Sequence, residues 1–435
     1  MSDLKQQILK LVKDFYDENH LAKKFIPSQS YIPVSGKVYD HTDLQNLVEA
    51  SLDFWLTSGR FNAEFEKSLA NYLQVKYVLT CNSGSSANLI ALSSLTSNLL
   101  KDKALKAGDE VITCATGFPT TINPILTNNL IPVFLDVDIP SYNIDTSKLE
   151  EAITPKTKAI MIAHTLGNPF DLEKISAIAK KYNLFLIEDS CDALGAEYNG
   201  KKVGTFGDVG TLSFYPAHHI TMGEGGAVFT NNSVLKRAME SIRDWGRDCY
   251  CKTGQDNTCN KRFCQKIGDL PFGYDHKYAY SHLGYNLKIT DMQASVGLSQ
   301  LKHLEKFIKK RRENFDFLLK NFQQFEEFFI LPQSENKSNP SWFGFALTIK
   351  PNVKFSRQDL IIFLEEHKIG TRLLFGGNLL KQPYMQNKNY KIIGNLKNSD
   401  IVMNNSFWIG VYPSIGLEQL NYIITIFKKF IQKYA

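Results

Sequence analysis

The chain has 435 residues, 43% of them hydrophobic and 22% charged, and a formal net charge of +6. This composition is that of a globular protein of two or three domains, and it excludes a disordered or fibrous chain. The weak positive charge gives no reason to expect nucleic-acid binding, and the densest basic run, at residues 309–312, is expected to be the solvated face of a helix. No apolar run approaches the roughly 18 residues of a membrane span and no signal peptide is recognisable, so we expect a cytoplasmic protein without membrane contact.

In chain order, the first expected elements are amphipathic helices over residues 4–16 and 44–56, separated by a loop rich in proline and serine. Short, nearly continuous apolar runs follow, with helical spacers between several of them. These strand candidates are residues 77–80, 110–113, 131–135, 159–163, 184–187, 210–213 and 227–230. Such runs are typical of strands that are buried on both faces, so the pattern predicts an α/β fold with a mostly parallel sheet.

Residues 245–285 are rich in Cys, Gly and Asn and lack periodicity, so we expect a loop insertion with a function of its own. A long helix is expected over residues 290–322, leading into a smaller α+β domain. In that domain the expected strands are residues 342–349 and 371–375, and the expected helices are residues 359–366 and 417–434. The predicted domains are an N-terminal helical segment (1–50), a large domain with the insertion (51–300) and a small C-terminal domain (301–435).

Three sites at strand ends could bind one phosphorylated ligand. The turn NSGSSAN at residues 82–88 opens a helix, where backbone N–H groups suit a phosphate, although a plain capping turn has the same pattern. Asp189 follows a buried strand, where open α/β sheets bind ligands, and could equally be a helix cap. Ser213 ends another strand and could donate to the phosphate. His218 follows it, and both residues could also be structural.

The segment SFYPAHHITMGEGGA at residues 213–227 resembles the one that carries the cofactor lysine in sugar aminotransferases of pyridoxal-phosphate fold type I, with His218 in the place of the lysine. From about residue 59 to residue 300, further segments resemble the sugar aminotransferase/dehydratase family of this class, among them TGFPTT (116–121) and LGYNLKITDMQ (283–293). The resemblance implies the fold type I architecture, bound pyridoxal or pyridoxamine phosphate, and a homodimer. The cofactor-binding residues it implies are Gly84, Ser85 and Ser213 at the phosphate, Phe118 on the ring, Asp189 at the ring nitrogen, and Asn286 reaching the phosphate of the neighbouring subunit.

The histidine at position 218 changes the expected chemistry. A lysine forms a Schiff base with the cofactor, whereas an imidazole only moves protons, so we expect non-covalent pyridoxamine phosphate with His218 as the catalytic base. The expected reaction is the loss of the C3 hydroxyl from a 4-keto-sugar, and a sugar aminotransferase is disfavoured. A catalytically silent binding protein on this fold is the alternative of another class. The presence of Asp189, Ser213 and the phosphate turn together argues against it.

The seven cysteines are an odd number, which favours metal-binding or reactive thiols over a disulfide framework. The pattern C-x57-C-x-C-x7-C of Cys191, Cys249, Cys251 and Cys259 resembles the branch of the family that holds a [2Fe–2S] cluster. The resemblance implies C3 deoxygenation of CDP-4-keto-6-deoxyglucose in O-antigen sugar biosynthesis, with electrons from a separate NADH-dependent flavin/iron–sulfur reductase. On the residues alone, a structural zinc site of Cys249, Cys251, Cys259 and Cys264 in a self-sufficient dehydratase stays open.

Overall fold

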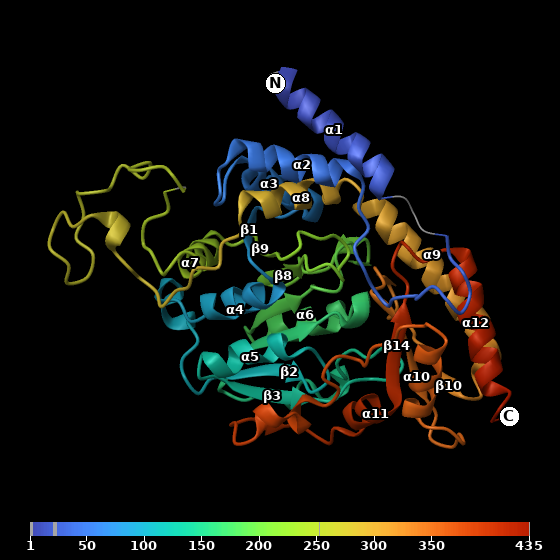
Figure 1. The fold of residues 1–435 in the computed structure, drawn as a ribbon. Coiled ribbons are helices and arrows are strands. Elements are labelled where there is room, and N and C mark those ends of the chain that lie inside the picture. The colour runs from blue at the N-terminus through green and yellow to red at the C-terminus, as the bar shows by residue number, and fades with distance from the viewer. Residues whose placement is uncertain (1–2, 21–23, 252, 435) are drawn as a thin grey trace.

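The computed structural model describes residues 3–20, 24–251 and 253–434, and its centre is an eight-stranded, mostly parallel sheet (Figure 1). In spatial order the strands are β1 (Tyr77–Cys81), β9 (Gly226–Thr230), β8 (Val209–Ser213), β5 (Phe185–Asp189), β4 (Thr157–Ala163), β2 (Glu110–Cys114), β3 (Ile131–Leu135) and β13 (Lys391–Ile392). Only β9 runs antiparallel to its neighbours, β1 and β8. All seven strands predicted from apolar runs are confirmed, with ends that differ by at most two residues.

Both faces of this sheet are buried, which explains why its strands are apolar throughout. In β4 and β5, Met161 and Ile187 belong to one core cluster, whereas Ile160 and Leu186 belong to the cluster on the opposite face. The helices before and around the sheet are α1 (Asp3–Asn19), α2 (His41–Asp53), α3 (Arg60–Leu73), α4 (Gly84–Ser94), α5 (Pro119–Thr127), α6 (Leu172–Lys181), α7 (Ser233–Arg243) and α8 (Asp291–Leu301). No helix of the described residues is long and apolar enough to cross a membrane.

The C-terminal part builds a second, smaller layer. It consists of α9 (Leu304–Phe322), β10 (Phe329–Ile330), β11 (Ser338–Asn339), β12 (Gly344–Ile349), α10 (Arg357–Glu366), α11 (Lys397–Asn405), β14 (Ser406–Gly410) and α12 (Leu417–Ile431). Its core is aromatic: the ring of Phe322 lies 5.2 Å from that of Phe345 and 4.8 Å from that of Phe427. Two pairings tie this part to the large one, because β13 extends the large sheet and β11 joins β6 (Glu197–Tyr198) and β7 (Lys201–Lys202).

Four of the expected elements are wrong in detail. The single helix over residues 290–322 is two helices, because the N–H groups of Lys302 and His303 turn back to the carbonyls of Ser299 and Gln300. Residues 371–375 form one bridge, between Arg372 and Trp408, and no strand. The strand expected from residue 342 begins at residue 344, and the helix expected to residue 434 ends at residue 431.

The insertion expected at residues 245–285 is confirmed as a loop. Its described residues contain one short 3-10 helix, His276–Tyr278, between α7 and α8. In Figure 1 the loop extends from the left side of the body, beyond α7.

Candidate active site

A cavity of about 400 Å³ lies at the carboxyl ends of the central parallel strands. Because parallel strands end at the same edge, residues that are far apart in the sequence meet here. The residues that line it include Ser83, Gly84, Ser85, Phe118, Asp189, Cys191, Asp192, Ser213, His218, Phe343 and Phe375. The structure thus gathers every predicted cofactor residue except Asn286 around one cavity. Asn286 instead accepts a hydrogen bond from Lys288 Nζ at 3.0 Å, outside the cavity lining.

The first turn of α4 forms one wall of the cavity. Ser83 caps the helix by accepting the N–H of Ser86 at 3.1 Å, so the positive end of the helix opens on the cavity. Gly84 is required here, because a Cβ atom at this position would lie 2.5 Å from Cβ of Ser213. The close approach of turn and strand makes a cradle whose backbone N–H groups fit a phosphate.

Asp189 is buried at the floor of the cavity and is held by neutral donors. Its Oδ2 accepts hydrogen bonds from Asn88 Nδ2 at 2.8 Å and Thr121 Oγ1 at 2.7 Å, and its Oδ1 accepts from the N–H of Cys191 at 3.2 Å. No ion pair with Asp189 forms among the described residues. A buried carboxylate without a cationic partner fits the protonated ring nitrogen of a pyridoxal cofactor.

His218 lies on a tight turn at the side of the cavity, where its N–H donates to the carbonyl of Tyr215 at 2.9 Å. Burial, and then the nearby charge of Arg311, lowers the pKa of His218 to about 4, so the imidazole is neutral at pH 7. Its Nδ1 has no hydrogen-bond partner and lies 3.4 Å from Oδ1 of Asp192. Burial and the charge of Asp189 raise the pKa of Asp192 to about 8, so this pair is also neutral at pH 7.

Arg311 is the exception to the expectation that residues 309–312 are a solvated face, whereas Lys309 is exposed as expected. The side chain of Arg311 is 1% exposed and donates to the carbonyls of Trp342 at 3.2 Å, Phe343 at 3.4 Å and His218 at 3.3 Å. Asp192 and Arg311 are the two residues near His218 that sequence reasoning missed. Asp192 could have been found from its place in the turn after Asp189. Arg311 could have been found from the helical period, because it lies three residues after Ile308 and four before Phe315, on the buried stripe of α9.

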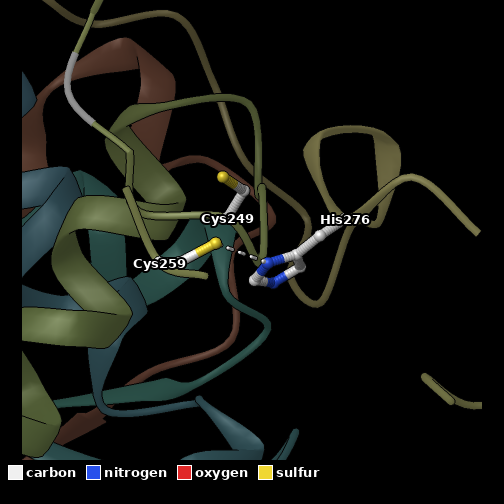
Figure 2. Close-up of side chains that lie close together, drawn as sticks. All are labelled: Cys249, Cys259 and His276. Carbon is white, nitrogen blue, oxygen red and sulfur yellow. Dashed lines mark hydrogen bonds between the residues drawn. The ribbon is translucent and has the colours of Figure 1, made fainter. Parts of the chain in front are cut away.

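A cluster of possible metal ligands lies on the insertion loop, where Cys249, Cys259 and His276 point toward one another (Figure 2). His276 Nδ1 lies 3.6 Å from the sulfur of Cys259, and its Nε2 lies 2.6 Å from Oδ2 of Asp248. Cys251 is beside them: burial raises its pKa, but hydrogen bonds involving Thr258 and the backbone of Cys259 outweigh burial and lower it to about 7. Thiolates of this kind suit a soft metal. His276 has no signal in the sequence that would have assigned it to the cluster.

The two remaining candidate ligands, Cys191 and Cys264, lie away from this cluster. The sulfur of Cys191 is on the wall of the cofactor cavity, 3.0 Å from the place of a Cβ atom at Gly84, and burial raises its pKa well above the usual range. Cys264 is exposed and donates only to the carbonyl of Asn260. Among the described residues, neither sulfur joins the donor atoms that converge beside His276. The four-cysteine set predicted for a [2Fe–2S] cluster is therefore not assembled within one chain.

The sheet, the phosphate-type turn of α4 and the buried aspartate define a pyridoxal-phosphate-dependent protein of fold type I. More particularly, the chain belongs to the DegT/DnrJ/EryC1/StrS aminotransferase family, whose pattern matches residues 38–428. It is 59% identical over 429 residues to the lipopolysaccharide biosynthesis protein RfbH of Salmonella typhimurium, with 99% of this chain and 98% of RfbH covered. It is 49% identical over 431 residues to the dTDP-4-dehydro-2,6-dideoxy-D-glucose 3-dehydratase of Saccharopolyspora spinosa, with 99% and 93% covered. The solved structure of the Escherichia coli GDP-4-keto-6-deoxy-D-mannose-3-dehydratase with bound hydrated PLP superposes with a TM-score of 0.81, at 29% identity, over 92% of this chain and all of that one.

Proposed function

We propose that this protein is a pyridoxamine-phosphate-dependent 3-dehydratase that removes the C3 hydroxyl of a nucleotide-linked 4-keto-6-deoxy sugar. The observation that carries the proposal is the neutral imidazole of His218 on a cavity that also holds Asp189 and Ser213, and whose described lining contains no lysine. Two of the relatives, named as 3-dehydratases of keto-deoxy sugars, support the same reaction class.

In this proposal the residues around the cavity have separate roles. The turn at Gly84 and Ser85, with Ser213, binds the cofactor phosphate, and Phe118 covers the ring. Asp189 pairs with the ring nitrogen and keeps it protonated. When bound, the cofactor would supply an amine for the sugar ketone and a ring that withdraws electrons. His218 takes and returns a proton at C4′ of the cofactor, which a neutral imidazole does at pH 7.

The reaction balances as follows in atoms and electrons. The C3–O bond breaks, and the hydroxyl leaves with one proton as water. Overall, the reaction takes up two electrons and two protons. One of these protons leaves with the hydroxyl as water, and the other becomes the new hydrogen at C3. We propose that NADH provides the electrons through a separate flavin/iron–sulfur reductase. Cys191, Cys249, Cys251 and Cys259 are the residues that would hold a [2Fe–2S] cluster, which would supply one-electron transfer. In the described chain Cys191 lies on the cofactor cavity, apart from the loop cysteines.

The substrate we propose is CDP-4-keto-6-deoxyglucose, which makes the protein a CDP-4-keto-6-deoxyglucose 3-dehydrase of 3,6-dideoxyhexose biosynthesis. The similarity to RfbH supports a place in lipopolysaccharide biosynthesis. The choice of CDP rests on the resemblance of the four-cysteine pattern to the CDP-sugar branch of the family, while other relatives carry dTDP or GDP in their names.

The test is a panel of CDP-, GDP- and dTDP-linked 4-keto-6-deoxy sugars incubated with the holoprotein in H2¹⁸O. We expect ¹⁸O exchange at C3 with the CDP sugar, and no exchange in His218→Asn, which should still bind pyridoxamine phosphate. Exchange at C3 with only the GDP-linked or only the dTDP-linked sugar would show that the substrate carries that nucleotide in place of CDP. Amino transfer from glutamate without C3 exchange would replace the proposal with an aminotransferase.

A further inference from the structure

A second group of possible metal ligands lies where α2 and α9 begin. One carboxylate oxygen each of Asp40 and Asp43 and a ring nitrogen of His303 all lie within 4.8 Å of one another. Asp40 caps α2, Asp43 lies in its first turn, and His303 precedes α9 at the break after α8. These residues are far apart in the sequence and meet because α2 packs along α8 (Figure 1). None of the three belongs to the described lining of the cofactor cavity.

Two polar atoms of this group are buried without a hydrogen-bond partner. Asp43 is 4% exposed, and its Oδ1 has no partner among the residues that the structure describes. The same is true of Nε2 of His303, which lies 3.3 Å from Oδ2 of Asp40. A simple pair between His303 and Asp40 would still leave Oδ1 of Asp43 without a donor. A buried oxygen of this kind destabilises the fold unless a bound ligand compensates it.

The second oxygen of each carboxylate is already held. Oδ1 of Asp40 accepts hydrogen bonds from the N–H of Thr42 at 2.8 Å and from its Oγ1 at 2.6 Å. Oδ2 of Asp43 accepts from Nε2 of Gln300 at 2.8 Å and from the N–H of Asp40 at 3.0 Å. Burial raises the pKa of Asp40, but the hydrogen bonds from Thr42 outweigh burial and hold it below its usual value. Hydrogen bonds of this kind orient the carboxylates that bind metals.

We propose that Asp40, Asp43 and His303 bind one divalent transition-metal ion, with water in the remaining positions. One imidazole and two carboxylates suit ions such as Zn²⁺ and Mn²⁺, and the two carboxylates balance the charge of the ion. Two ligand atoms on one tetrahedral zinc ion are about 3.4 Å apart, because each lies about 2.1 Å from the metal. The 3.3 Å between His303 Nε2 and Asp40 Oδ2 is close to that separation.

The proposed ion would have a structural role, because it joins the start of α2 to the start of α9. Gln300 connects this place to the turn of His218. Its Nε2 donates to Asp43 and, at 2.9 Å, to the carbonyl of Val38, while its Oε1 accepts the N–H of Thr221 at 3.3 Å. Thr221 follows His218 by three residues. A bound ion would therefore brace the His218 turn through one side chain.

The test is a titration of chelator-treated protein with Mn²⁺, in which electron paramagnetic resonance measures the free ion. Mn²⁺ is the probe because it prefers carboxylate and water ligands to the thiolates of the insertion loop. We expect one Mn²⁺ per chain, and binding at least about tenfold weaker in Asp43→Asn and in His303→Gln. Asp359→Asn is the matched control and should bind as wild type does. Asp359 has the same place in the capping box of α10 but belongs to no ligand group of the described residues.

Thermal melting gives a second measurement. Saturating Mn²⁺ should raise the melting temperature of the wild type and of Asp359→Asn but not that of His303→Gln, because only the folded state holds the site. Melting without metal shows that the variants are folded.

Three outcomes would overturn the inference. Wild-type protein could bind no stoichiometric Mn²⁺ at about 1 mM, or Asp43→Asn and His303→Gln could both bind it as tightly as wild type. Loss of Mn²⁺ binding in Cys259→Ser would assign the ion to the insertion loop instead. All three results leave the proposed 3-dehydratase reaction standing, because the site lies outside the cofactor cavity.

Discussion

Replacement of Asp189 by Asn tests the cofactor site most directly, because it changes the charge with little change of shape. The carboxylate holds two neutral donors on Oδ2, Asn88 and Thr121, and an amide oxygen can keep both. What is lost is the charge that faces the cofactor nitrogen and, on the Oδ1 side, the acceptor of the Cys191 N–H at 3.2 Å. A hydrogen bond to a charged group contributes about 1.5–3 kcal/mol, so the dissociation constant for pyridoxamine phosphate should rise about 10- to 150-fold.

The assay is an equilibrium titration of apoprotein with pyridoxamine phosphate, followed by absorbance or calorimetry. Thr211→Val is the matched control, because it removes a buried hydroxyl that lies 2.7 Å from Asn88 Oδ1 and 3.5 Å from Asp189 Oδ1 but leaves the charge of the carboxylate in place. Its affinity should change less than about fivefold, the equivalent of about 1 kcal/mol. If Asp189→Asn binds within about threefold of wild type, the carboxylate does not pair with the ring nitrogen.

Three further predictions concern the same cavity. Gly84→Ala should lower the melting temperature and weaken cofactor binding, since the new Cβ would meet Cβ of Ser213 at 2.5 Å and overpacking costs about 1–3 kcal/mol; unchanged affinity would move the phosphate elsewhere. Borohydride treatment of the holoprotein should leave no pyridoxyl group on the chain, because no lysine lines the described cavity, and a labelled lysine in the mass spectrum would contradict this. Histidine hydrogen–deuterium exchange in the apoprotein should give His218 a pKa near 4. Since its usual value is 6.5, the unfolded state binds a proton that the folded state does not, so the free energy of unfolding should fall from pH 6.5 toward pH 4, less so in His218→Asn.

The sheet could be predicted from the sequence because its determinants are local. Each buried strand is a continuous apolar run, and the polar residue that follows it, such as Asp189 after β5, marks the ligand edge. The break between α8 and α9 could not be predicted from the sequence, because neither Lys302 nor His303 is a glycine or a proline. It depends on two turns of backbone hydrogen bonds.

The parts of the site that escaped prediction depend on contacts between distant segments. His276 meets Cys259 and Asp248 across 17 and 28 residues of a loop without periodicity. Arg311 lies on the buried stripe of α9, but the carbonyls that accept its hydrogen bonds and make its burial possible belong to other segments of the chain. The roles of Asn286 and Cys191 stay predictions, because Asn286 is expected to act in the neighbouring subunit and Cys191 lies apart from the loop cysteines in the described chain.

The guanidinium of Arg311 also limits how the molecule can move. It donates at once to the carbonyl of His218, on the turn after β8, and to those of Trp342 and Phe343, which lead into β12 of the small sheet. A hinge motion that swung the C-terminal layer away from the large sheet would have to break these hydrogen bonds or pull the His218 turn along. Opening of the cavity for the proposed substrate would therefore be mechanically linked to the position of His218. Access should come instead from the side of Phe118 and Tyr215, where the cavity residues are exposed.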